Sequence, residues 1–230
     1  ICHEFSYNKI AEAYEPYLGL IRQMFHKYCS GTLEEFMEEC DVYKLQRPVF
    51  ESYFEKGFCE RTEQILIDEV EYEQERMHSS IVTMLQKLSE ICPIVIVLNR
   101  FQLASKSTMQ LTNRLLQTKN KNIGIVLGVN DVQSIPEFAH EEWDAICESM
   151  DDRNMVYHIG NAGRNMEPDV MDYYSDYESD DGYRKLNNLV YFLDFDQADH
   201  HLSKIERRIK FDNFTISEKK HYQLLLLQIM

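Results

Sequence analysis

Two runs of apolar, mostly β-branched residues dominate the middle of the chain. They span 94–98 (Ile-Val-Ile-Val-Leu) and 123–129 (Ile-Gly-Ile-Val-Leu-Gly-Val). The segment between them, 107–118, carries Leu111 and Leu115 at helical spacing. A strand, a helix and a second strand joined by connections of this length predict a parallel sheet with helices on its faces. Because the run at 94–98 is apolar at every position, we expect that strand to be covered on both faces.

Elements of the same kinds are expected on both sides of this unit. Downstream, the pattern predicts a helix over 136–150 and a third short strand over 155–159. Upstream, it predicts an extended segment at 1–5 and then several helices. The helix signals are Pro16 at a helix start, a Thr32–Glu35 capping box, a helix from Pro48 that Gly57 ends, and a long apolar stripe over about 62–91. The fold class is therefore α/β, with a parallel sheet and flanking helices, followed by a C-terminal helical segment.

The chain divides into three parts by composition. Residues 1–165 form the α/β domain, with a helical insertion at 30–91. Residues 166–183 are rich in acids and lack bases, so their mutual repulsion predicts a mobile, solvated loop. Helical periodicity returns over 184–230, where the spacing favours two or three antiparallel helices of the tetratricopeptide-like kind.

Composition narrows the classes of partner. The 230 residues are 44% hydrophobic, enough for a core, and the formal net charge of −15 argues against a nucleic-acid partner. No window has the roughly 20 apolar residues of a membrane helix, and no signal peptide is visible, so no membrane partner is expected. Six scattered cysteines without a C-x-x-C pair favour a reducing, cytoplasmic location. Because the sequence begins at Ile1 and ends inside an apolar run, we expect a piece of a longer protein.

The most informative stretch is 92–107, which is followed by the leucines at 111 and 115 and by the run at 123–131. Upstream, Cys2-His3-Glu4-Phe5 precedes Tyr14-Glu15-Pro16-Tyr17. Over residues 1–160, approximately, these segments resemble the signal-transduction ATPases related to the AAA+ proteins, a group of P-loop NTPases. The first stretch looks like the family's Walker B strand, the next helix and the sensor strand, and residues 2–17 look like the strand after the phosphate loop and the entry to a helix. The resemblance implies a P-loop NTPase-like sheet that is incomplete here.

The departures from this family concern its chemistry. No glycine is followed by lysine, so the chain has no phosphate loop, and that loop would precede Ile1. The paired acids at the end of the Walker B strand are replaced by Asn99 and Arg100, and a later acidic position is Ser105. Asn supplies no negative charge to a hard cation and Arg repels it, so ATP hydrolysis by this chain is not expected. The resemblance makes Asn99, Arg100 and Asn130 the positions expected beside a nucleotide; Asn130 is equally explained as a turn or capping residue.

Other polar groups have simpler structural explanations. The acids and histidines at 194–201 could share a metal, but Asp196 as a helix cap explains them better. The acids of 167–181 lack the spacing of a calcium loop. His158 and the Gly160–Gly163 segment follow the expected third strand, where parallel sheets hold ligands, but a turn also requires such glycines. We expect neither catalytic nor metal-ligating residues in this chain.

These observations support a leading hypothesis and two alternatives. The leading one is a degenerate, non-catalytic nucleotide-hydrolase-like regulatory module of a bacterial signalling protein. Its resemblance implies helical repeats and an output domain as intramolecular partners, such as a GGDEF-type or adenylate cyclase or a DNA-binding regulator, and allows a homo-oligomer; ATP and magnesium would be cofactors of the longer protein only. The first alternative is an active ATPase with its phosphate loop upstream and acids such as Asp131 or Glu4. The second is a protein-interaction scaffold.

Overall fold

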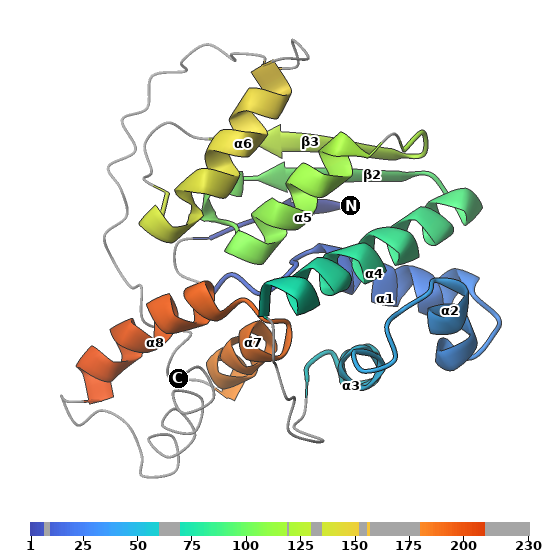
Figure 1. Cartoon of the computed structure of the whole chain (residues 1–230), viewed down its shortest axis with the longest axis horizontal. Coiled ribbons are helices and arrows are strands. Elements are labelled where there is room, and N and C mark those ends of the chain that lie inside the picture. The colour runs from blue at the N-terminus through green and yellow to red at the C-terminus, as the bar shows by residue number, and fades with distance from the viewer. Residues whose placement is uncertain are drawn as a thin grey trace.

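The computed structural model describes residues 1–6, 10–59, 70–118, 120–129, 135–151, 156 and 180–209. Among these residues the strands are separated by helices, with four α-helices between the first and second strands and one between the second and third (Figure 1). The strands are β1 (Cys2–Glu4), β2 (Ile94–Asn99) and β3 (Ile123–Gly128). The helices are α1 (Tyr17–Tyr28), α2 (Leu33–Glu39), α3 (Arg47–Lys56), α4 (Val70–Ile91), α5 (Lys106–Gln117), α6 (His140–Asp151), α7 (Asp180–Tyr191) and α8 (Phe195–Ile209), with short 3-10 turns at Phe101–Leu103 and Glu137–Ala139.

The sheet is small and entirely parallel among the residues described. Its strand order is β1-β2-β3, with β2 in the centre. Cys2 lies opposite Val97, and Ile94 lies opposite Ile123. The prediction that the runs at 94–98 and 123–129 pair in parallel is confirmed. The extended segment at 1–5 supplies the third strand.

One face of β2 is covered and the other is open. Ile94, Ile96 and Leu98 are buried, and α5 and α6 lie over this region of the sheet in Figure 1. Val95 is 57% exposed and Val126 on β3 is 54% exposed. The prediction that both faces are covered is therefore wrong. Successive side chains of a strand point to opposite faces, and a run that is apolar throughout does not itself reveal whether the second face has a cover.

Local signals set the helix ends as predicted. The Glu35 backbone N–H donates to Thr32 Oγ1 at 3.2 Å, and the Thr32 N–H donates back to Glu35 Oε2 at 2.8 Å, which completes the capping box before α2. Pro16 is the N-cap of α1, and Gly57 ends α3 in the left-handed conformation with φ +80°. The start expected near residue 62 for the long helix lies outside the described residues, which begin again at Val70.

Helix α4 lies below the sheet in Figure 1 and beside α1, and α2 and α3 lie farther from the sheet. Its apolar stripe is buried as the spacing predicts, through Met77, Ile81, Met84, Leu85 and Leu88. A single apolar core includes these residues together with side chains of α1, α3, β2, α5 and α7. The sheet, the helical insertion and the C-terminal helices therefore share one core.

Helices α7 and α8 belong to the segment predicted to be helical. Helix α7 begins at Asp180, so residues 180–183 are helical and not part of the loop predicted over 166–183. Residues 166–179 of that loop lie outside the described residues, as do 210–230 and most of the strand expected at 155–159. The start of α7 was missed because the dense acids at 176–181 obscure its first turn.

Within the described ranges, each helix is either too short or too polar to cross a lipid bilayer.

Candidate functional site

The carboxyl ends of the three strands meet at one edge of the sheet because the strands are parallel. Glu4 ends β1, Asn99 ends β2 and Gly128 ends β3. The backbone N–H of Phe5 also donates to the Asn99 carbonyl at 3.1 Å, which holds the end of β1 against β2. Two of the three residues expected beside a nucleotide, Asn99 and Arg100, lie at this edge. The third, Asn130, is outside the described residues.

Arg100 turns the chain sharply out of the sheet. Its backbone is in the left-handed conformation, with φ 55° and ψ 43°, which is costly for a residue with a side chain. Its Nε atom lies 3.3 Å from Oε1 of Glu4 on the neighbouring strand. The ion pair neutralises the only acid that the described strand ends carry. Among the described residues, the three strand ends therefore offer a hard cation no uncompensated carboxylate.

Asn99 lies close to the end of β3. A Cβ atom on Gly128 would stand 2.8 Å from Asn99 Oδ1, so glycine gives the amide its space. On the other side, Asn99 Nδ2 donates a weak hydrogen bond to Cys2 Sγ at 3.9 Å. The amide supplies one neutral oxygen, and Mg²⁺ is bound in proteins through carboxylates. The residues at 99–100 therefore do not fit a magnesium–ATP site of the usual kind.

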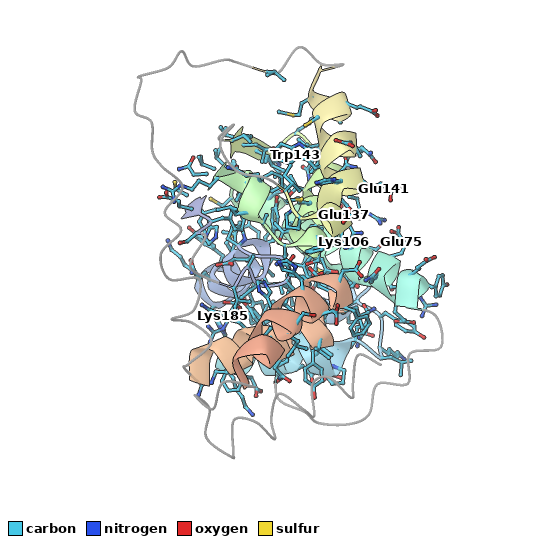
Figure 2. The ribbon with its side chains drawn as sticks, turned by 90° about the vertical axis from the view of Figure 1, so that its left-hand side faces the viewer. Glu75, Lys106, Glu137, Glu141, Trp143 and Lys185 are labelled. Atoms are coloured by element: carbon cyan, nitrogen blue, oxygen red, sulfur yellow. The ribbon has the colours of Figure 1, made fainter. Side chains whose placement is uncertain are left out.

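A small cavity of about 100 Å³ adjoins the end of β1. His3 Nε2 lies 3.3 Å from Glu15 Oε1 beside it. Lys185 of α7 also lines this cavity, and Figure 2 shows Lys185 on the lower part of the molecule. The sheet edge is thus adjacent to the C-terminal helices, a neighbourhood that the sequence did not reveal.

The amino end of α5 is the second part of the site. Ser105 is fully buried and caps α5 by accepting from the Thr108 N–H at 3.3 Å. The Ser105 hydroxyl also donates to the Glu12 carbonyl at 2.9 Å. A second backbone N–H in the first turn of α5, that of Ser107, donates to Asp194 Oδ2 at 2.9 Å. A carboxylate from the C-terminal segment thus lies at the positive end of the α5 dipole.

Asp194 is buried and also begins α8. It is 2% exposed, and its Oδ1 accepts from the Gln197 N–H at 3.4 Å. Burial raises the pKa of Asp194, and the hydrogen bonds from Ser107 and Gln197 oppose that rise. The prediction that Asp196 caps this helix is wrong. Helix α8 begins earlier than expected, at Phe195, so the cap is Asp194.

Asp196 has a different role, as the partner of Lys106. Lys106 Nζ lies 2.6 Å from Asp196 Oδ2 on α8 and 3.7 Å from Glu142 Oε1 on α6. Figure 2 shows Lys106 between α6 above and the C-terminal helices below. One lysine on α5 therefore joins α6 to α8. The acids of 194–199 do not converge, and no group of three or more His, Cys, Asp or Glu side chains in the described part of the chain could hold a metal ion.

Helix α7 is attached through two neighbouring asparagines. Asn188 Oδ1 accepts from the Cys59 N–H at 2.8 Å, and Asn188 Nδ2 donates to Glu12 Oε2 at 3.2 Å. Asn187 donates to the Cys59 carbonyl. Both asparagines are buried. Sequence reasoning missed these residues because their partners are more than a hundred positions away; two adjacent amides in an otherwise apolar helical stripe were the only signal.

Comparisons of the chain with protein-family models, with curated proteins and with solved structures find no match. Function must therefore be argued from the geometry of this chain. The described geometry offers two linked parts: a strand edge without cation-binding charge, and a buried polar junction that attaches α7 and α8 to α5.

Proposed function

We propose that this chain is a non-catalytic regulatory module built on a nucleotide-hydrolase-like α/β fold. The observation that carries the proposal is the end of the central strand. Asn99 and Arg100 stand where the resembling ATPases have paired acids, and Arg100 is bound to Glu4 of the neighbouring strand. The proposal is also supported by the parallel pairing of these three segments in the order β1-β2-β3.

The replacement of two acids by Asn99 and Arg100 changes which ligand the strand edge can bind. A guanidinium group binds phosphate oxygens directly and repels a divalent cation. We therefore assign the edge to binding a nucleotide phosphate without magnesium, with Arg100 as the contacting group. Hydrolysis requires the cation that the edge no longer attracts, so the bound nucleotide acts as an effector.

We assign the contacts between α5 and the C-terminal helices to passing the effect of ligand binding from the strand edge to α7 and α8. Asp194 and Lys106 connect α5 to α8, and α7 lies beside the cavity at the end of β1. A ligand that binds one arrangement of these helices better than another shifts the population toward it. The domains that respond to this change in population would be helical repeats and an output domain. The output domain would be a cyclase or a DNA-binding regulator of a bacterial, cytoplasmic signalling protein.

The test restores the missing charge at the strand end. The double substitution Asn99→Asp with Arg100→Glu places two new carboxylates beside Glu4. If the edge is a degenerate cation site, this variant gains affinity for Mn²⁺, used as a spectroscopic substitute for Mg²⁺. Metal at about 100 times its Kd would stabilise the fold by about 2.7 kcal/mol. Electron paramagnetic resonance of Mn²⁺ and thermal unfolding both report this gain.

The matched control makes the same change of charge at the opposite edge of the sheet. Asn122→Asp with Lys121→Glu alters residues immediately before β3, at the edge where the strands begin and where no nucleotide contact is proposed. We expect Mn²⁺ binding in the first variant only. Equal Mn²⁺ binding by both variants would show that added negative charge alone causes the binding. It would contradict the proposal that the strand edge is a degenerate cation site. Magnesium-dependent ATP turnover by the unmodified chain would instead favour the active-enzyme alternative.

A further inference from the structure

A cavity of about 520 Å³ lies between the 40–47 segment and one face of α4. Figure 1 places this part of the molecule below α4, on the side away from the sheet. Its volume falls within the range of small-molecule sites in proteins, roughly 300–1,000 Å³. The helix contributes residues 76, 79, 80 and 83, which share one face at helical spacing. This cavity is separate from the strand edge and from the α5 junction.

The charges around the cavity are opposite in sign to those of the whole chain. Among the described residues, Lys44, Arg47 and Arg76 line it against one acid, Asp41, in a protein with a formal net charge of −15. Lys44 is exposed and has no ion-pair partner within the described part of the chain. A concentration of cations in a hollow of an acidic protein focuses attraction on an anion.

Arg47 is held in place by a backbone carbonyl, and Arg76 by two tyrosine side chains and Glu73. Arg47 Nε donates to the Val42 carbonyl at 3.1 Å, which fixes the guanidinium, and its terminal nitrogens make no hydrogen bond to another described residue. The Arg76 guanidinium lies 3.8 Å from the centre of the Tyr43 ring and 4.2 Å from that of Tyr72. Its ion pair with Glu73, at 3.4 Å, is the only one it makes among the described residues. Positioned guanidinium groups lose little freedom when they bind an oxyanion.

We infer that this cavity binds a phosphorylated small molecule. Lys44 and Arg47 contact the phosphate, Arg76 adds positive charge from α4, and Ser80 offers a hydroxyl on the same helix face. The volume exceeds that of a free phosphate ion, so the remaining space holds the organic part against Val42 and the Tyr43 ring. Arginine favours phosphate through paired N–H groups that match two oxygens of one phosphate.

The experiment is isothermal titration calorimetry with inorganic pyrophosphate and with ribose 5-phosphate, in a buffer of physiological salt without metal. The chain and every variant of it carry Arg100→Gln, so that the phosphate contact proposed at the strand edge does not contribute. We expect saturable binding of both probes. The variant Lys44→Gln with Arg47→Gln should weaken each by roughly a hundredfold, about tenfold for each removed cation, as expected for charged hydrogen bonds. If the double variant does not fold, the single variant Lys44→Gln, at an exposed turn residue, replaces it. We expect this variant to weaken binding of each probe about tenfold.

The control is Lys121→Gln, which removes an exposed lysine distant from the cavity and should leave both affinities unchanged. Absence of saturable binding, or binding that the Lys44 and Arg47 substitutions do not weaken, would overturn the inference. Citrate binding as tightly as the phosphates would also overturn it, since the cavity would then select carboxylates. The Mn²⁺ experiment uses residues 99 and 100, so failure there and failure here are distinguishable.

Discussion

The Asp194 carboxylate accepts a hydrogen bond of 2.9 Å from the backbone N–H of Ser107, 87 positions earlier in the chain. It joins the start of α8 to the first turn of α5. Because the same carboxylate caps α8, one buried side chain fixes two helix ends. The C-terminal helices are therefore part of the α/β unit and not an appendage to it.

Asp194→Ala should destabilise the fold strongly. It leaves the N–H groups of Ser107 and Gln197 buried without an acceptor, which costs about 2–4 kcal/mol of the free energy of unfolding. Asp194→Asn keeps one acceptor oxygen, so its cost should be about half. Urea unfolding measures both. Asp196→Asn, at an exposed side chain, is the control and should cost less than about 1 kcal/mol. Equal costs for Asp194→Ala and Asp196→Asn would contradict this role.

The raised pKa of Asp194 has a consequence of definite sign. The folded state holds the proton more tightly than the unfolded state, so this group lowers the free energy of unfolding as pH rises from about 4 toward neutrality. In Asp194→Asn the group no longer titrates. The stability advantage of the unmodified chain over the variant should therefore shrink with rising pH. An advantage that grows over this range would show that the hydrogen bonds outweigh burial.

His78 predicts a pH dependence of the opposite sign. Burial on α4, against the Tyr14 ring at 5.4 Å, lowers the pKa of His78 to about 4. The unfolded histidine takes up a proton near pH 6.5 and the folded one does not, so stability is full above that pH and falls between about 6.5 and 4. The loss should approach about 3 kcal/mol, because each tenfold change in proton affinity is worth about 1.4 kcal/mol. His78→Gln should flatten the dependence of the free energy of unfolding on pH between about 6.5 and 4. An unchanged slope would show that another group causes the loss of stability.

Gly128 and Asn99 should be energetically coupled. Gly128→Ala places a methyl group against the Asn99 amide, 2.8 Å from Oδ1, and should cost about 1 kcal/mol. With Asn99→Ala already present, the same change should be neutral or slightly stabilising. A double-mutant cycle measures the coupling. Additive effects would mean that the amide does not stand over the end of β3.

Lys106 should stabilise the attachment of α8. Lys106→Met removes its contacts with Asp196 and Glu142 and should cost about 1 kcal/mol, since the side chain is only partly exposed. Hydrogen exchange of the α8 amides should accelerate. The control, Lys87→Met, breaks the more exposed pair with Glu39 and should change neither quantity appreciably. Unchanged exchange in α8 after loss of Lys106 would refute the link.

Short-range signals predicted the elements well, and long-range contacts accounted for the failures. The Thr32–Glu35 capping box and the pairing of the two apolar runs follow from local pattern and connection length. The open face at Val95 and the cap of α8 at Asp194 depend on what packs nearby in space. For the strand edge, pattern located Asn99 and Arg100, but the Glu4 contact spans most of the α/β unit and no spacing rule predicts it.

Thermal unfolding of the chain with ATP or ADP, with and without magnesium, tests the proposed effector site at the strand edge directly. It is best done with Lys44→Gln and Arg47→Gln present, so that only the strand edge responds. We predict that nucleotide raises the unfolding midpoint to the same extent with and without magnesium, because Arg100 meets the phosphate directly. A rise that requires magnesium, or no rise with either nucleotide, would contradict a nucleotide-responsive module that has lost its cation site.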